Sequence, residues 1–202
     1  TEIDTKARFV RLRGGAKLGY GKLVIATGSE AVRLPLPGAD LPGVVTFRDK
    51  SDVEVILSRA RPGARAVVIG GGLLGLEAAY GLMKAGAHVS VVHLMDRLME
   101  RQLDVHAAGL LKDALEARGI QVLLNAESEA IQGRRKVAGL RLKDGRNVPA
   151  DLVVMAVGIR PNVRLARGAG LESNRGIVVG DDMQTSSPDI HAIGECAEHR
   201  GT

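Results

Sequence analysis

The sequence has few cysteines and few aromatic residues. Cys196 is the only cysteine among 202 residues, which excludes an internal disulfide and indicates a reducing compartment, so we expect a cytoplasmic protein. A [4Fe–4S] cluster needs about four thiolates, and this chain cannot supply them by itself. Two Phe, two Tyr and no Trp leave little material for stacking nucleotide bases.

Long apolar runs and runs of one charge are also absent. No stretch approaches the roughly 18 apolar residues of a membrane span, so we expect no membrane association. The 28 basic and 23 acidic residues give a net charge of +5, but the two signs are interleaved along the chain. Such interleaving is typical of a solvated surface, so we expect no nucleic-acid partner. The chain opens with Thr1 inside a strand-like pattern, which predicts a piece of a larger protein.

The order of apolar and polar segments predicts an α/β protein. Short apolar runs that are typical of buried strands in a parallel sheet alternate with helical segments. Ser51 and Glu54 predict a capping box for a helix that ends near Ala60, and Asp104 is expected to cap another that ends near Arg118. The remaining predicted segments are exposed hairpin strands in 1–15, a buried strand in 22–30, a strand–turn–helix–strand unit in 64–93, a strand in 119–126, a β-meander in 129–148 with a turn at Asp144-Gly145, and a buried strand in 151–162.

A glycine-rich turn carries the strongest functional pattern. Gly70, Gly72 and Gly75 have the spacing GxGxxG, directly after an apolar strand and at the start of a helix. The first glycine permits the tight turn, the second admits a pyrophosphate, and the third lets helix and strand pack closely. The first helical residues, Leu73 and Leu74, then offer free N–H groups at the positive end of the helix dipole. This context predicts a dinucleotide-binding site.

The end of the following strand bears on the choice of dinucleotide. An Asp or Glu about 20 residues after the turn usually binds the ribose of NAD. Here that position holds His93, with Asp96 and Arg97 just beyond it. In one interpretation His93 and Arg97 bracket a 2′-phosphate, which favours NADPH. In the other, His93 caps the strand and Asp96 or a water molecule binds the ribose.

Other chemistry-bearing patterns are incomplete. Residues 14–23 resemble a phosphate-binding loop but lack the required spacing and the final Ser or Thr, so a hairpin loop is expected. Cys196 and His199 have no second pair of ligands, so we expect no metal site. No Ser-His-Asp or Cys-His arrangement is present, and we expect no catalytic residue from the protein and no hydrolytic chemistry.

Four motifs together resemble those of the pyridine nucleotide-disulfide oxidoreductases, which are FAD- and NAD(P)H-dependent reductases. They occur in the order of that superfamily and span nearly the whole chain. The motifs are LVIATGS (23–29), GGGLLGLEAA (70–79), LVVMAVGIRPN (152–162) and SPDIHAIGECA (187–197).

The resemblance implies a Rossmann-like, doubly wound α/β fold in which an NAD(P)H-binding domain interrupts an FAD-binding domain. Residues 1–46 would be the end of the first FAD-domain segment, 47–165 the NAD(P)H-binding domain with its small β-meander, and 166–202 the start of the second FAD-domain segment. It also implies that the glycines binding the FAD pyrophosphate would precede Thr1.

The resemblance also implies roles for individual residues. Thr27 and Gly28 belong to the motif that lines the FAD site, and Glu195 stands where relatives have an Asp that contacts the ribityl chain. Glu77 matches an acid near the nicotinamide, with a helix-surface Glu as the alternative interpretation. Gly158 ends the strand that approaches the nicotinamide from the other side.

More narrowly, the turn together with LMERQLD (98–104) resembles the flavin-containing part of the large subunit of assimilatory NAD(P)H nitrite reductases. That resemblance implies hydride transfer from NAD(P)H to FAD, with sirohaem and a [4Fe–4S] cluster outside this chain. The alternatives are a rubredoxin or ferredoxin reductase, an NADH-oxidase-like flavoprotein, or a non-catalytic nucleotide-binding module. Strand-like ends at 1–25 and 175–180 would pair either within one chain or with a second copy in a homodimer.

Overall fold

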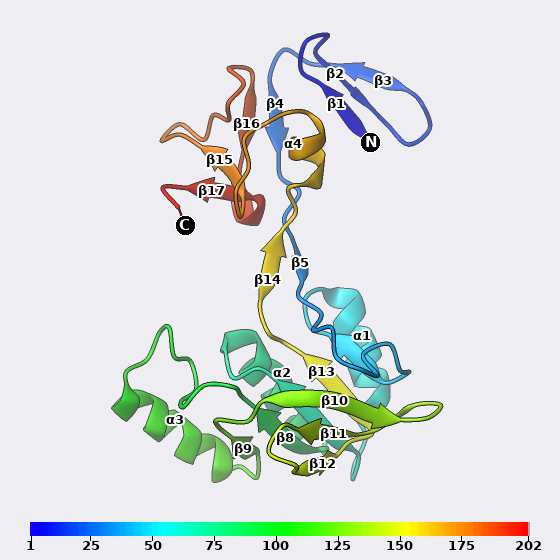
Figure 1. Ribbon diagram of the computed structural model, residues 1–202, viewed down its shortest axis with the longest axis vertical. Helices are drawn as coiled ribbons and strands as arrows, with labels where there is room; N and C mark the ends of the chain where they lie inside the picture. The colour runs from blue at the N-terminus through cyan, green and yellow to red at the C-terminus, as the bar shows by residue number, and fades with distance from the viewer. Residues whose placement is uncertain (202) are drawn as a thin grey trace. The chain divides into compact units, whose positions relative to one another are not determined.

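A computed structural model describes residues 1–201 as two compact units (Figure 1). Unit 1 combines Thr1–Glu30 with the residues from Ile159 onward, and unit 2 is Ala31–Gly158. The central unit was predicted to span 47–165, so it begins and ends earlier in the chain than the sequence indicated. Among residues 1–201, no helix is both long and apolar enough to cross a bilayer.

The segment between 31 and 46 explains the early start of unit 2. Residues 33–43 within it are rich in Pro and Gly, a composition that is typical of a connection between domains. Its apolar side chains instead pack into the unit: Ala39 and Val44 are buried, and Leu34 and Leu41 contact the same cluster. The free energy gained by burying these apolar side chains holds the segment against unit 2 despite its loop-like composition. The segment ends in a strand of the central sheet.

Unit 2 is built on the predicted parallel sheet. Its order is β6-β13-β7-β8-β9, and all neighbouring strands are parallel. The chain runs outward from β7 in both directions, first through β8 and β9 and later back to β13, which makes the end of β7 a topological switch point. The strands are β6 (Val44–Thr46), β7 (Arg65–Ile69), β8 (His88–Val92), β9 (Gln121–Leu123) and β13 (Leu152–Met155), and the helices are α1 (Lys50–Arg59), α2 (Leu73–Lys84) and α3 (Val105–Glu116).

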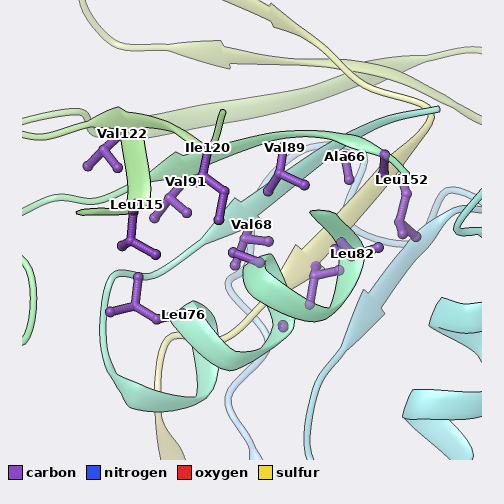
Figure 2. Close-up of a cluster of buried hydrophobic side chains, with 14 of the residues drawn as sticks. Ala66, Val68, Leu76, Leu82, Val89, Val91, Leu115, Ile120, Val122 and Leu152 are labelled. Atoms are coloured by element: carbon purple, nitrogen blue, oxygen red, sulfur yellow. The ribbon is translucent and has the colours of Figure 1, made fainter. Parts of the chain in front are cut away.

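Two apolar layers bury the two faces of this sheet. On one face, Leu76 and Leu82 of α2 pack with Val68 and Val91 of the sheet in a cluster that Figure 2 shows. On the other face lies the predicted meander, in which β11 supplies the fully buried Leu140. The meander strands are β10 (Ser128–Gly133), β11 (Val137–Leu142) and β12 (Asn147–Pro149), all antiparallel, and Gly145 of the predicted turn has a φ of 87°.

One of the two predicted helix caps is confirmed and the other is wrong. Asp104 accepts the backbone N–H of Ala107 at 2.8 Å and caps α3. The cap of α1 is Asp49, not Ser51, because the Asp49 carboxylate accepts the N–H of Asp52 at 3.0 Å and α1 already begins at Lys50. Ser51 lies inside the first turn and donates its hydroxyl to Asp49.

Unit 1 contains short strands from both ends of the chain. The predicted hairpin strands form an antiparallel sheet, while β4 and β15 pair in parallel with strands of the C-terminal segment, so the strand-like ends pair within one chain. The strand in 22–30 was expected to be buried, but Val24 of β4 is 55% exposed because this sheet has only two strands. The elements are β1 (Glu2–Asp4), β2 (Phe9–Arg11), β3 (Lys17–Gly19), β4 (Leu23–Ile25), α4 (Arg164–Gly168), β15 (Ile177–Val179), β16 (Ile190–Ala192), the short 3₁₀ helix η1 (Gly194–Cys196) and β17 (Ala197–His199); β5 (Ser29–Ala31) and β14 (Ile159–Pro161) pair with each other.

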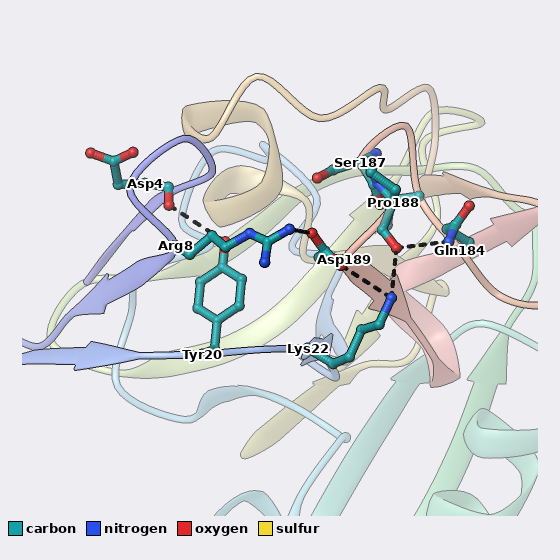
Figure 3. Close-up of polar contacts among 9 residues, drawn as sticks. Asp4, Arg8, Tyr20, Lys22, Gln184, Ser187, Pro188 and Asp189 are labelled. Carbon is teal, nitrogen blue, oxygen red and sulfur yellow. Dashed lines mark hydrogen bonds and ion pairs between the residues drawn. The ribbon is translucent and has the colours of Figure 1, made fainter.

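Asp189 joins the two segments of unit 1 (Figure 3). Its carboxylate forms ion pairs with Arg8, from the loop after β1, and with Lys22, whose ammonium lies 3.1 Å away. The hydrogen bond from Lys22 is the main cause that lowers the pKa of Asp189 below its ordinary value. Lys22 also donates to the carbonyl oxygen of Pro188 at 3.1 Å. These contacts hold residues more than 160 positions apart in one unit.

Gly75 sets how closely α2 approaches β7. A Cβ atom on Gly75 would lie 2.1 Å from the carbonyl oxygen of Gly70 and 3.5 Å from the Ala156 side chain. Gly81, two turns further along the same helix, has no atom within 4 Å of the equivalent position. The helix therefore has one glycine that its packing requires and one that it does not.

We expect Gly75→Ala and Gly81→Ala to change stability in opposite directions. Gly75→Ala pushes a methyl group into fixed backbone and should lower the free energy of unfolding by about 1–3 kcal/mol. Gly81→Ala meets no clash and should raise it by about 0.5–1 kcal/mol because alanine favours the helix. Urea unfolding of the two variants measures both values, and equal effects would contradict the close approach at Gly75.

Asp151 provides a pH-dependent contribution to the stability of unit 2. It accepts hydrogen bonds from the Arg65 guanidinium at 2.9 and 3.0 Å and from the Arg65 backbone N–H at 3.1 Å, which lowers its pKa to about 2. The pKa in the unfolded chain is about 3.9. The contribution is therefore complete above about pH 4–5 and is lost as the pH falls toward 2.

Asp151→Asn should lower the free energy of unfolding at pH 7 by about 0.5–1 kcal/mol, the range of solvent-exposed ion pairs. The difference from the wild type should shrink as the pH falls from 4 toward 2, because the wild-type carboxylate then gains its proton. Urea titrations across this range measure the difference, with Asp113→Asn on α3 as the control. A difference that stays constant down to the acid limit would exclude this contribution.

Candidate functional site

The glycine turn passes between the ends of two strands at the carboxyl edge of the sheet in unit 2. Gly70 follows β7 directly, and its N–H donates to the carbonyl oxygen of Val92 at 2.9 Å. Its φ of 118° lies in the region that favours glycine, and a Cβ there would lie 2.3 Å from the carbonyl oxygen of Ala156. The fold itself therefore requires Gly70.

Gly72 differs from Gly70, Gly71 and Gly75 because no described neighbour excludes a side chain there. Its φ is −83° and its ψ −179°, which any residue adopts, and a Cβ would have no atom within 4 Å. It precedes α2, which has no side-chain cap and no acid in its first turn. Within residues 1–201, no hydrogen bond uses the N–H groups of Gly72, Leu73 and Leu74. Unused donors at a helix N-terminus are suited to an anion.

Gly71 contacts the end of β8 and the loop that follows it, and the GxGxxG spacing does not identify this contact. A Cβ on Gly71 would lie 2.7 Å from both His93 and Leu98. Its N–H donates to Nδ1 of His93 at 3.0 Å, and its carbonyl oxygen accepts the N–H of Met99 at 3.0 Å. Two features of the sequence could have indicated this contact: a third consecutive glycine, and a histidine where an acid is usual.

His93 is buried and contacts Gly71 of the turn. It is only 7% exposed, and its Nε2 lies 3.1 Å from the Glu100 carboxylate. Arg97 folds back on its own loop, where it donates to the carbonyl oxygens of Glu100 and Leu103 and to Asp96. This geometry favours the interpretation in which His93 has a role within the protein over the one in which it meets a 2′-phosphate.

Glu77 is exposed on α2, where the sequence pattern placed it. It borders a mainly apolar groove of about 170 Å³ between α1 and α2, together with Phe47 and Ile56. The contact with a nicotinamide that the resemblance implies stays a prediction. Gly158 has a φ of 110°, and its carbonyl oxygen accepts the N–H of Val32 at 3.0 Å.

The residues expected at a flavin lie together in unit 1. The Thr27 hydroxyl donates to the carbonyl oxygen of Asn162 at 2.7 Å, and the carbonyl oxygen of Gly28 accepts the Asn162 N–H at 2.9 Å. Ser29 donates to the Glu195 carboxylate at 2.9 Å. The structure therefore brings Thr27, Gly28 and Glu195 close to one another, although they are up to 168 positions apart in the chain. Their contact with FAD stays a prediction.

Known proteins of similar sequence and structure support one family. The nitrite reductase [NAD(P)H] of Bacillus subtilis is 52% identical over 200 residues, which are 99% of this chain and 25% of that protein. The assimilatory nitrate reductase electron transfer subunit of the same organism is 48% identical, over 100% of this chain and 26% of that protein. The chain thus spans about a quarter of the length of these two relatives.

The fold matches solved reductases closely. The ferredoxin reductase of the CYP199A2 system from Rhodopseudomonas palustris has a TM-score of 0.95 and 37% identity, over 98% of this chain and 50% of that one. The pyridine nucleotide-disulphide oxidoreductase family matches residues 1–202. With the glycine turn at the switch point of a doubly wound sheet, these matches show that the chain belongs to the pyridine nucleotide-disulphide oxidoreductase family.

Proposed function

We propose that unit 2 binds a nicotinamide dinucleotide, NADH or NADPH, with its pyrophosphate at the glycine turn. The observation that carries this proposal is the open position of Gly72. Gly70, Gly71 and Gly75 are each explained by a neighbour that a Cβ would strike, whereas Gly72 has none. A bound pyrophosphate that approaches the backbone would explain the glycine at position 72.

The donors at the start of α2 suit this ligand. The N–H groups of Gly72, Leu73 and Leu74 are not used by the described protein atoms, and the helix dipole adds partial positive charge at the same place. The nearest acid on the helix is Glu77, beyond its first turn. A doubly charged pyrophosphate would therefore meet donors and no opposing carboxylate in that turn.

The reaction that we propose is that of a flavoprotein reductase. When both groups are bound, the chemistry that they would supply is transfer of a hydride, two electrons and one proton, from the reduced nicotinamide to FAD, which leaves an oxidised nicotinamide and a reduced flavin. The chain's own residues would bind and orient the two groups: the glycine turn the dinucleotide, and Thr27, Gly28 and Glu195 the flavin. The protein supplies positioning and electrostatics, and no nucleophile of its own.

The relatives favour nitrite reduction as the destination of the electrons. The two relatives from Bacillus subtilis, at 52% and 48% identity, are named for nitrite reduction and assimilatory nitrate reduction. The rubredoxin-NAD(+) reductase of Pseudomonas putida is 38% identical. We therefore propose that the natural protein passes electrons to nitrite through metal centres outside residues 1–202, and that a rubredoxin or ferredoxin acceptor is the alternative. Four downstream cysteines with cluster spacing would support the first and their absence the second.

Gly72→Ala tests the dinucleotide site. The added methyl group meets no described atom, so the variant should lose at most about 1 kcal/mol of unfolding free energy, the cost of alanine at the helix N-cap. The same methyl group occupies the approach of the pyrophosphate, so the dissociation constant for NADH and NADPH should rise about tenfold or more. Calorimetric titration of the 202-residue chain with NADPH and then NADH, without flavin, measures it.

Gly81→Ala on the same helix is the matched control and should bind as the wild type does. If Gly72→Ala binds as tightly as Gly81→Ala, the pyrophosphate does not lie at this turn. If the wild-type chain binds neither NADH nor NADPH, the proposed autonomous site is wrong. Dye reduction by the natural protein with NADPH and added FAD would contradict a non-catalytic module.

A further inference from the structure

The peptide groups on both sides of Gly71 are held by contacts outside the turn. The N–H of Gly71 donates to Nδ1 of His93 at the end of β8, and its carbonyl oxygen accepts the N–H of Met99 from the loop that follows. Leu98 of the same loop is fully buried against this glycine. His93 and the loop therefore fix the turn at Gly71, while the Cβ position of Gly72 stays open.

The hydrogen bonds determine the form of the His93 ring. A backbone N–H can only donate, so Nδ1 must carry no proton and must act as the acceptor. The proton of the neutral ring then lies on Nε2, which donates to Glu100 at 3.1 Å. Both ring nitrogens of His93 thus have hydrogen-bond partners within the protein.

This contact directly precedes the donors of the proposed site. Gly71 is followed by Gly72, Leu73 and Leu74, whose N–H groups would meet the pyrophosphate. The Gly71 N–H belongs to the peptide that joins Gly70 and Gly71, and the next peptide, which carries the Gly72 N–H, is bonded by Met99. Rotation of the first peptide would change the dihedral angle φ of Gly71 and with it the direction of the N–H groups that follow. Glycine has the broadest backbone freedom of any residue, so an outside contact is the means by which a run of three glycines keeps one conformation.

We propose that His93 is a positioning residue for dinucleotide binding: its Nδ1 holds the Gly71 peptide and thereby aims the donors of the glycine turn at the pyrophosphate. The residue acts through Gly71 and does not touch the ligand. This inference rests on the proposed dinucleotide site. At the end of β8, where an acid usually binds the ribose, His93 would instead act on the backbone of the glycine turn.

Two amide substitutions separate this role from general packing. In His93→Asn the side-chain oxygen occupies the place of Nδ1 and can still accept the Gly71 N–H. In His93→Gln the amide extends to the place of Nε2, keeps a partner in Glu100, and leaves the Gly71 N–H without an acceptor. His88→Asn and His88→Gln, at the exposed start of β8, are the matched controls.

Calorimetric titration of the 202-residue chain with NADH measures affinity, and amide hydrogen exchange at Gly71 reports the contact without any ligand. For His93→Asn we expect protection of Gly71 and a dissociation constant within about threefold of the wild type. For His93→Gln we expect lost protection and an affinity about tenfold or more below the wild type, because a buried donor loses its partner.

The outcomes separate this inference from the proposed function. Equal affinities of the two His93 variants, with a wild type that binds NADH, would overturn the positioning role and leave the dinucleotide site intact. A wild type that binds neither NADH nor NADPH would overturn both. If one variant unfolds, exchange at Gly71 in the wild type and in Gly72→Ala still decides: rapid exchange in both would exclude a held peptide.

Discussion

The close approach of α2 to the end of β7 is the constraint on which the site depends. Gly75 and the carbonyl oxygen of Gly70 leave no room for a Cβ, and Gly70 in turn lies against Ala156 at the end of β13. This packing fixes where the helix begins relative to three strand ends. Because the helix begins there, its first N–H groups lie at the carboxyl edge of the sheet, where an open α/β sheet binds its ligands.

Much of the fold could be predicted because its determinants are short-range. An apolar run followed by glycines and a helical pattern specifies β7, the turn and α2 within about 20 residues. The Asp104 cap is equally local. Local pattern is not enough where tertiary burial decides: the segment 31–46 is rich in Pro and Gly, yet Ala39 and Val44 enter the core. At α1, Asp49 and Ser51 lie two positions apart and both are residue types that cap helices, and Asp49 rather than Ser51 does so.

The residues of the candidate site also divide into those that local sequence identifies and those that only the fold brings together. The spacing of Gly70, Gly72 and Gly75 is local and identifies the turn. The proposed role of His93 is not local, because it depends on the contacts of residues 98–100 with Gly71 and His93 and on the proton form that Gly71 imposes. A sequence shows that a histidine replaces an acid, but it does not show which way the ring points. In unit 1, similarly, the contact between Ser29 and Glu195 requires the two ends of the chain to meet.

The four glycines of the turn show how a structure separates fold from function. A glycine is needed for one of two reasons: its backbone conformation or a neighbour excludes a side chain, or a ligand does. Gly70, Gly71 and Gly75 each have a protein neighbour that explains them. Gly72 has an ordinary backbone conformation and open space, so the protein alone would tolerate almost any small residue there. We propose that the remaining reason is a ligand, and the unused N–H donors around Gly72 favour an anion.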